Sequence, residues 1–555
     1  MASAVLLLSF SFVTVLSPSG LHPLVWERWV RLGHRSPTSM SDGELIKDTP
    51  KTSGDVLEVD VAVIGNGPSA LALSAVLSGL VPRVKLGTSQ YIRDRNLKRA
   101  AQALEKVTGG LDEVDLSLWA KGIQRRCVNP TAALIDALRF PDGDGMGQSV
   151  LSFDQRKKPI SHVLIGSGPP GGSWHEMSAT TQSLSPGFWM DLPGKYSLAA
   201  HLDSSEASEE ARSLSSRAGG VHSVTQNRVP RWVVAEYYAA YAARHVPRNA
   251  FLQGVVNSLS ESAGSDESLQ QKRWTLNVTD ANRAFQRSVN SEGKVAATVR
   301  AKAVVLAGGI HDKPVKLNVS GETLPWVFHR VSTTLNFLTQ SNLPRHHLLV
   351  VGAGLSAADS IISAFRRRNA QKEIRISHVF RQQAPKTKIG KMFGTRLPSD
   401  PTYGEEALLA KLMAGTARDE WYKPYSETSL AKIHDDGSCV LSSGPVLKDV
   451  TAVAILIGSG PNLDFLPPSI SHSLLKDPNS QQLRTDGQPS SHPCFVDVDP
   501  ATFEVLDASR VKRHVVPGLF AMGPLRGDNF VRFITGDSLA IRRRLSLHSD
   551  SSVTD

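Results

Sequence analysis

Two apolar, β-branched runs dominate the hydrophobic pattern of the chain, at residues 59–64 and 347–351. Short runs without polar alternation are typical of parallel strands that are buried on both faces. An Ala-, Leu- and Ser-rich stretch of helical character follows each run directly. More strands are predicted at 161–165, 303–306, 374–380 and 453–457, and helices at 130–140 and 233–244. The pattern therefore predicts an α/β protein built from strand–loop–helix units.

The loops between these two strands and their helices carry the glycine spacing of a dinucleotide-binding fingerprint. The first loop contains Gly65, Gly67, Pro68, Ser69 and Ala70, and the second contains Gly352, Gly354, Leu355, Ser356 and Ala357. Glycine allows a tight turn, and a helix N-terminus offers free N–H groups and a positive dipole end to a pyrophosphate. Either loop alone could be an ordinary glycine turn. Two in one chain predict two nucleotides held face to face, which hydride transfer from a nicotinamide to a flavin requires.

Two further small-residue turns follow predicted strands. Gly171, Gly172 and Trp174 come shortly after 161–165, and a paired glycine before an aromatic residue is a turn that flavin domains lay along the cofactor. Ala307, Gly308 and Gly309 directly follow 303–306, and they suit close backbone packing on a nucleotide. The aromatic-rich turn at 185–193 could wall the flavin ring.

Arg381 lies just beyond the strand predicted at 374–380. An NAD enzyme holds the ribose hydroxyls with an acid at this place, whereas an arginine can neutralise a 2′-phosphate. The residue therefore favours NADPH over NADH, with a solvent-exposed arginine at a strand end as the alternative interpretation.

Length and charge change this picture little. With 555 residues and 41% hydrophobic residues, the chain can bury a large core spread over several domain-sized units. The formal charge of +10 allows attraction to phosphate-bearing ligands or anionic surfaces. We interpret the densest basic clusters, 366–368 and 542–544, as solvated helix faces or ends. They lack the interleaved aromatics of a nucleic-acid groove, so we expect no nucleic-acid partner. The Ser- and Glu-rich stretches 202–220 and 261–271 are predicted to be flexible surface insertions.

The three cysteines, Cys127, Cys439 and Cys494, are far apart and form no C-x-x-C pair. This excludes the usual dithiol reductase and fits a reducing, cytoplasmic compartment. No spacing typical of zinc ligands occurs, so no metal is expected. Residues 1–53 are predicted to be an N-terminal extension. Its apolar run at 4–16 is too short for a membrane span, which leaves a weak secretory signal or a translation start at Met40, and we prefer the second.

The motifs together resemble flavin-containing monooxygenases, and more narrowly the oxidative stress-induced growth inhibitor family. The narrower resemblance rests on Gly-Asn-Gly-Pro-Ser at 65–69, Gly-Ala-Gly-Leu-Ser-Ala-Ala-Asp at 352–359 and Gly-Asp-Asn-Phe-Val-Arg-Phe at 527–533. It covers roughly residues 58–543. The resemblance implies an NADPH-dependent monooxygenase associated with control of growth, differentiation, cell death and cytokinesis. It leaves regulatory protein partners and a midbody location open, and it does not indicate the substrate.

Site roles are also implied by this resemblance. The first loop would hold the FAD pyrophosphate, and Gly172 and Trp174 would contact the body of FAD. The second loop would cradle the NADPH phosphates, with Arg381 on the 2′-phosphate. At the C-terminal end, Gly527 and Asp528 would meet the ribityl chain, and Asn529 and Phe530 would start a helix aimed at the ring. Gly523-Pro524 is the alternative match to the usual Gly-Asp pair. The chain has Leu164-Ile165-Gly166 where those enzymes carry an acid that binds the adenosine ribose.

We expect two Rossmann-like domains, with the NADPH module inserted into the FAD module. The FAD domain is predicted at 54–320 and 490–545, the NADPH domain at 321–489, and a disordered tail at 546–555. Three functions fit the sequence. The first is an NADPH- and FAD-dependent monooxygenase, and the second is an oxidase or reductase that releases hydrogen peroxide. The third is a nucleotide-sensing regulatory scaffold without flavin chemistry, which the missing ribose acid favours.

Overall fold

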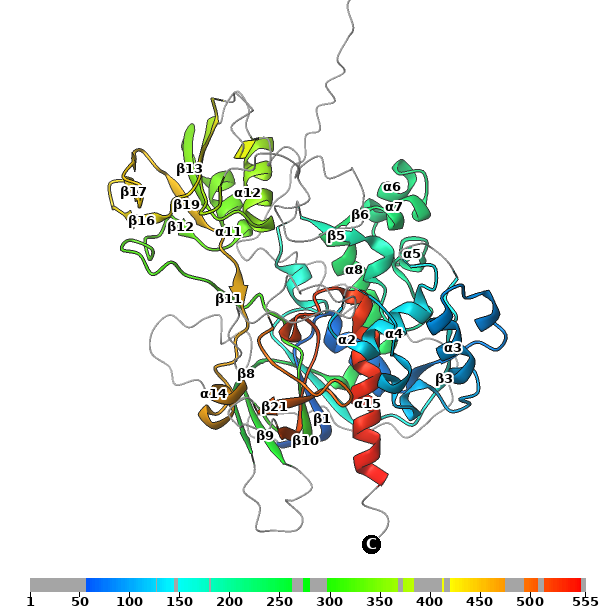
Figure 1. The fold of residues 1–555 in the computed structure, drawn as a ribbon. Helices are drawn as coiled ribbons and strands as arrows, with labels where there is room; N and C mark the ends of the chain where they lie inside the picture. The colour runs from blue at the N-terminus through cyan, green and yellow to red at the C-terminus, as the bar shows by residue number, and fades with distance from the viewer. Residues whose placement is uncertain are drawn as a thin grey trace, which may run out of the picture.

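The computed structural model describes residues 56–550 of the chain, with gaps. Within that range it leaves out 126, 144–147, 179–180, 262–272, 280–296, 368–372, 384–411, 414–419, 475–493 and 508–513. The predicted extension at 1–53, almost all of the stretch predicted at 261–271 and the last five residues of the predicted tail therefore lie outside the described residues. The larger of two main sheets lies in the lower part of Figure 1, and the smaller lies at upper left.

The larger sheet has eight strands: β1 (Val56–Ile64), β4 (His162–Gly166), β7 (Phe251–Gln253), β8 (Val255–Glu261), β9 (Trp274–Thr279), β10 (Ala297–Leu306), β21 (Glu504–Asp507) and β22 (His514–Ala521). The strand order is β21-β22-β10-β1-β4-β7, and the run from β22 to β7 is parallel. Val63, near the C-terminal end of β1, is paired with Val305 on one side and Leu164 on the other. This part of the strand is buried on both faces, which is why residues 61–64 form a continuous apolar run.

The smaller sheet lies between β10 and β21 in the sequence. Its five strands are β12 (Val327–Phe328), β13 (Arg345–Val351), β14 (Glu373–Val379), β15 (Tyr422–Tyr425) and β19 (Ala452–Ile455). They are all parallel, in the order β12-β19-β13-β14-β15. The predicted α/β fold, with one nucleotide-binding module inserted into another, is thus confirmed. Two chain crossings connect the modules, and they pair as an antiparallel ribbon of β11 (Lys313–Pro314) and β20 (Ser459–Gly460).

The remaining strands form small antiparallel sheets. These are β2 (Leu80–Val84) with β3 (Leu151–Arg156), β5 (Gln182–Pro186) with β6 (Arg228–Pro230), and β16 (Leu430–Ile433) with β17 (Cys439–Leu441) and β18 (Val446–Leu447). The helices of the larger module are α2 (Pro68–Leu77), α3 (Arg95–Leu104), α4 (Pro130–Arg139), α5 (Leu198–Leu202), α6 (Glu209–Arg217), α7 (Val221–Gln226), α8 (Arg231–His245), α14 (Pro468–Leu474) and α15 (Ile534–Asp550). Those of the smaller module are α11 (Val331–Gln340) and α12 (Leu355–Arg366). No helix in the described part of the chain is long and apolar enough to cross a membrane.

Three sequence predictions about the surface need correction. The stretch 202–220 is not a simple flexible insertion, because it contains α6, with Ser208 as its N-cap and the buried Ala211 on its inner face. A serine cap, two glutamates in the first turn and an arginine in the last are ordinary helix signals. The segment predicted as a disordered tail also begins inside α15, which continues to Asp550.

The basic cluster 542–544 is not a solvated helix face. Arg542 is buried, and its Nε donates to Asp112 Oδ2 at 2.9 Å. Its Nη1 donates to the carbonyls of Val76 and Leu77, at the C-terminal end of α2. Arg542 thus satisfies carbonyls that a helix end leaves unpaired, and it ties α15 to α2, which lie side by side in Figure 1. Arg544 donates to Glu504 Oε2 at 2.8 Å.

Candidate nucleotide-binding sites

The first glycine loop joins β1 to α2. Gly65 has φ +126°, and a Cβ there would lie 2.4 Å from the carbonyl oxygen of Ala307, so only glycine fits. Gly67 is the N-cap of α2, and Pro68 follows at the start of the helix. A Cβ on Gly67 would meet nothing within 4 Å. The loop thus leaves open space at a helix N-terminus, where N–H groups and the helix dipole favour a phosphate.

The other two small-residue turns lie against this loop. Gly171 donates its N–H to the carbonyl of Asn66 at 2.9 Å, and a Cβ on Gly172 would be 3.0 Å from the Cα of Gly67. Ala307 donates its N–H to the carbonyl of Ile64 at 2.9 Å, and Gly308 and Gly309 continue from there. Trp174 in η4 (Gly172–His175) packs edge-on against Tyr238, with ring centroids 6.1 Å apart. The fold therefore brings together three segments that the sequence separates by more than a hundred residues each.

A hollow of about 250 Å³, open solvent included, lies beside the first loop at the ends of β4 and β7. Its lining consists of Asn66, Gly166, Gly168, Pro170, Phe251, Leu252 and Gln253. None of the described residues that line this hollow carries a carboxylate, in agreement with the missing acid after Leu164. The amide of Asn66 donates to the carbonyls of Gly168 at 2.5 Å and Pro169 at 3.2 Å. Asn66 thus holds the 166–170 turn, and the polar side chains in the described lining of the hollow, Asn66 and Gln253, are neutral amides.

The C-terminal signature reaches the first loop through Gly523. This residue follows β22 with φ +66°, and a Cβ there would lie 2.4 Å from Ser69 Oγ. Its N–H donates to Asp537 Oδ2 at 3.3 Å, at the start of α15. Asp537 Oδ1 is buried without a hydrogen-bond partner in the described part of the chain, although Arg526 Nη1 is 3.6 Å away. Burial raises the pKa of Asp537 to about 7, against the pull of Arg526 and with a smaller contribution from Asp528.

The predicted Asp528 is held by protein groups. Its Oδ1 accepts from the N–H of Val128 at 3.0 Å, and its Oδ2 pairs with Arg526 Nη1 at 3.4 Å. Burial raises the pKa of this carboxyl as well. Gly527, which precedes it, has φ +87°. Asp528 therefore fixes the turn that carries the signature, and its predicted contact with the ribityl chain stays a prediction.

The prediction that Asn529 and Phe530 start a helix is wrong, because α15 begins at Ile534, after the single turn η9 (Val531–Phe533). Phe530 is half-buried and packs edge-on against Trp189, with ring centroids 6.0 Å apart. Arg532 in the intervening turn is bound to Asp136 of α4.

The second glycine loop repeats the geometry of the first. Gly352 has φ +121°, and a Cβ there would lie 2.3 Å from the carbonyl oxygen of Leu456. A Cβ on Gly354, the N-cap of α12, would meet nothing within 4 Å. Leu355 and Ser356 are exposed in the first turn, whereas Ala357 is fully buried against the strand side. The loop is therefore an open helix N-terminus suited to a second phosphate group.

A buried histidine supports this second loop. His378 of β14 has its Nε2 2.6 Å from the carbonyl oxygen of Gly352 and its Nδ1 2.7 Å from the hydroxyl of Tyr422. The neutral ring with its proton on Nε2 satisfies both contacts, since it donates to Gly352 and accepts from Tyr422. Burial lowers the pKa of His378 to about 4, which keeps the ring neutral. Arg381 lies exposed just beyond the same strand, on the side of the loop.

Side chains link the two modules close to the second loop. Thr181 donates its hydroxyl to Asp359 of α12 at 2.6 Å. Arg330 pairs with Glu176 at 3.2 Å and donates to the carbonyl of Asp312 at 3.0 Å. These contacts place the turn that follows Trp174 beside the helix of the second loop.

Sequence reasoning missed Asn66, His378 and Asp537 as parts of the site. Asn66 lies inside the first fingerprint and carries a polar side chain, so the sequence could have indicated it as a site residue. His378 and Asp537 gave no local signal, because their roles depend on Gly352 and Gly523, which approach them only in the fold.

A parallel sheet with a glycine loop, interrupted by a second sheet of the same kind, defines the FAD/NAD(P)-binding class of α/β proteins. Among solved structures, ornithine hydroxylase from Pseudomonas aeruginosa has a TM-score of 0.50 and 12% identity, covering 89% of this chain and all of that one. This likeness shows the fold alone.

No family model matches the chain. The chain is 32% identical over 492 residues to oxidative stress-induced growth inhibitor 1 of Mus musculus, covering 86% of this chain and 93% of that protein. It is 29% identical over 533 residues to human oxidative stress-induced growth inhibitor 2, covering 90% and 96%. The chain belongs to the oxidative stress-induced growth inhibitor family.

Proposed function

We propose that the protein is an NADPH-dependent, FAD-containing monooxygenase-like oxidoreductase that acts in the control of cell growth. The observation that carries this proposal is the pair of open helix N-termini at Gly67 and Gly354, each on its own parallel sheet. The names of the relatives, growth inhibitors induced by oxidative stress, support the link to growth. We also propose the predicted division into an FAD domain, 54–320 with 490–545, and an NADPH domain, 321–489, except that α14 belongs with the FAD domain, whose core contains Ile470.

In this proposal the first loop binds the FAD pyrophosphate through N–H groups at the start of α2. Asp537 is fully buried and accepts from the N–H of Gly523, so it holds the Gly523-Pro524 turn against Ser69 of that loop. The second loop binds the NADPH phosphates, and Arg381 pairs with the 2′-phosphate.

When bound, FAD would supply electron transfer from NADPH and the reaction with dioxygen. The chain's own contribution is binding, orientation and exclusion of water. The buried Trp189 and the half-buried Phe530 form an aromatic wall at the C-terminal signature. The Thr181–Asp359 hydrogen bond holds the second module against the first. No side-chain nucleophile is needed for this class of chemistry.

Substitutions in the two loops test FAD binding and NADPH binding separately. Gly67→Asp and Gly354→Asp both place a carboxylate where a phosphate is expected, and open space at each Cβ means that neither should disturb folding. We expect Gly67→Asp to abolish FAD binding, seen as loss of flavin absorbance. Gly354→Asp should retain FAD and lose its anaerobic bleaching by NADPH. Gly67→Ala and Gly354→Ala are the matched controls. A wild-type protein that stays colourless with added FAD would refute the proposal.

One observation favours a second candidate, a nucleotide-sensing scaffold without flavin chemistry. The hollow beside the first loop has no carboxylate to hold the adenosine ribose. If the scaffold is correct, the protein binds NADPH, measured by quenching of tryptophan fluorescence, but takes up no FAD. An oxidase that releases hydrogen peroxide would instead bleach with NADPH and return every electron pair from NADPH as peroxide.

A further inference from the structure

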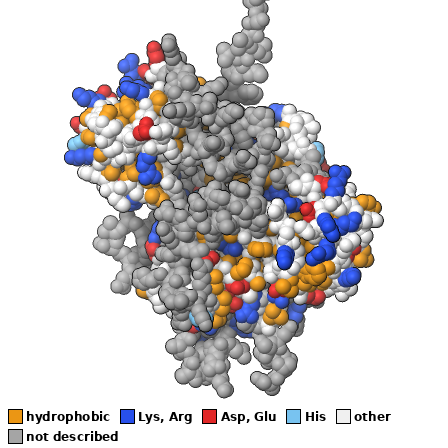
Figure 2. All heavy atoms as spheres, viewed as in Figure 1, with side chains coloured by type: hydrophobic (Ala, Val, Ile, Leu, Met, Phe, Trp, Pro, Cys, Tyr) orange, Lys and Arg blue, Asp and Glu red, His pale blue; other side chains and the backbone are white. Residues whose placement is uncertain are grey.

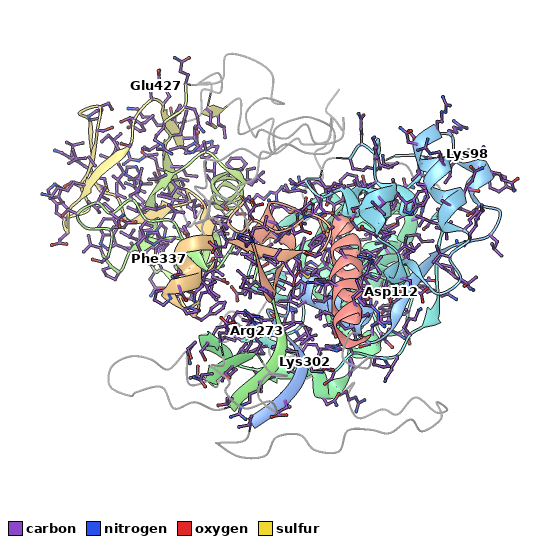
Figure 3. The ribbon with its side chains drawn as sticks, turned by 60° about the horizontal axis from the view of Figure 1, so that its bottom comes forward. Lys98, Asp112, Arg273, Lys302, Phe337 and Glu427 are labelled. Carbon is purple, nitrogen blue, oxygen red and sulfur yellow. The ribbon has the colours of Figure 1, made fainter. Side chains whose placement is uncertain are left out.

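The segment between β2 and α4 exposes several large apolar side chains. We call residues 83–121 the α3 lobe, because α3 and the turns η1 (Ser89–Tyr91), η2 (Leu111–Glu113) and η3 (Leu116–Trp119) form it. Leu86 is 84% exposed, Tyr91 77%, Leu118 73% and Trp119 36%. The lobe lies at the right edge of Figure 1, and Lys98 marks its outer end in Figure 3. An exposed leucine is unremarkable alone, but four such residues in one short segment indicate a contact surface.

The lobe is well anchored to the larger module. Leu97 and Leu104 of α3 are buried in a cluster that also contains helix α4. Asp112 is paired with Arg542 of α15, and Glu113 with Lys157. The exposed apolar residues therefore belong to a lobe that packs through its own buried residues and ion pairs against the larger module.

The α3 lobe has more basic than acidic residues, and its net charge is positive. Eight basic residues lie on it, all exposed or half-buried: Arg83, Lys85, Arg93, Arg95, Lys98, Arg99, Lys106 and Lys121. None of them forms an ion pair with a carboxylate in the described part of the chain.

The five acidic residues of the lobe are all engaged locally. Asp94 caps α3 and Asp115 caps η3, while Glu105 accepts from the N–H of Ser89. Asp112 and Glu113 form the two ion pairs given above. Figure 2 shows blue and orange side chains side by side over the right part of the molecule, where Figure 1 places α3.

We propose that the α3 lobe docks the protein on an anionic membrane surface. Lysine and arginine are attracted to acidic headgroups, and exposed leucines, tyrosine and tryptophan enter the interfacial zone without a spanning helix. Charge complementarity selects this occupant. Self-association through the lobe is disfavoured, because a second copy would present the same basic lobe and be repelled. Nucleic acid is disfavoured because its bases bind by stacking on aromatic rings, to which Leu86 and Leu118 contribute nothing. The proposal is independent of flavin chemistry.

The experiment is flotation of the full chain with vesicles of phosphatidylcholine, with or without phosphatidylserine. We expect binding only with phosphatidylserine, weakening as salt is raised. Leu86→Ser with Leu118→Ser should weaken binding about tenfold per leucine, from the lost apolar transfer. Arg95→Glu with Arg99→Glu should abolish it, and glutamate at the start of α3 is compatible with the helix.

The matched control is Leu343→Ser with Val446→Ser, which removes exposed apolar side chains from the smaller module. This control should float like the wild type. The proposal is overturned if phosphatidylserine vesicles do not retain the protein, or if the lobe variants and the control bind alike. Binding of single-stranded DNA or self-association through the lobe, measured by light scattering, in place of vesicle binding would also overturn it.

Discussion

The buried pair between Arg532 and Asp136 should contribute strongly to stability. Arg532 of the C-terminal signature donates from Nε and Nη2 to both oxygens of Asp136 in α4, at 2.5 and 2.8 Å. Asp136 is fully buried, and its other partner is Arg125, whose Nε is 3.0 Å away. The guanidinium of Arg532 also lies over the ring of Trp189, 4.1 Å from its centroid.

The magnitude follows from these contacts. Removing one partner of a buried ion pair costs about 3–5 kcal/mol, and the stacked guanidinium is worth about 1 kcal/mol. Because Arg125 still partners Asp136, we expect Arg532→Ala to lower the free energy of unfolding by about 4 kcal/mol. Arg532→Lys keeps the charge but loses the two-point geometry, so about 2 kcal/mol is expected. Arg532→Met with Asp136→Leu should be less destabilised than Arg532→Ala, since no buried carboxylate is left without Arg532, and Arg125 keeps its hydrogen bonds to the carbonyls of Gln124 and Phe140.

The assay is urea unfolding followed by far-ultraviolet circular dichroism, without added nucleotide so that ligand binding does not contribute. The double-mutant cycle of Arg532→Met, Asp136→Leu and the double variant should give a coupling energy of about 2 kcal/mol. Burial raises the pKa of Asp136 in spite of its arginines, and removing Arg532 raises it further. The carboxyl of the variant is then neutral at low pH and costly to ionise, so the defect should grow as pH rises. Additive single and double variants, or a defect below about 1 kcal/mol, would refute the reasoning.

Three other perturbations have definite expected outcomes. Burial lowers the pKa of His378 from 6.5 to about 4, so between these pH values the unfolded chain binds more protons than the folded protein. About 3 kcal/mol of stability should therefore be lost as pH falls from 6.5 to about 4. The pH dependence of urea unfolding should flatten in His378→Phe. Arg542→Ala should cost about 3 kcal/mol by stranding Asp112 and helix-end carbonyls, and Arg542→Lys should recover part of this in thermal unfolding. Gly523→Ala should cost at least about 2 kcal/mol, because φ is +66° and the new Cβ would meet Ser69 Oγ; an unchanged melting temperature would show that the turn relaxes.

The sequence alone determined the two nucleotide-binding units. A buried strand, a glycine turn and a helix N-terminus form within about twenty residues, so the turns at Gly65 and Gly352 are visible locally, although the carbonyls that exclude a Cβ there belong to the distant Ala307 and Leu456. The strands and helices predicted around them were found within a few residues, for example α4 and α8. Apolar runs of parallel strands are a strong local signal because both faces are buried.

Only the tertiary structure decided where charges and the C-terminal signature belong. Arg542 looks like a solvated cluster in sequence, but its partner Asp112 lies 430 residues away. A Cβ on Gly523 would meet Ser69 of the first loop, whereas the sequence resemblance pointed first to Gly527. An arginine can be buried only where the fold brings a carboxylate against it, because burying an unpaired charge costs too much free energy. Local pattern therefore predicts the elements, whereas long-range pairing decides which polar residues hold them together.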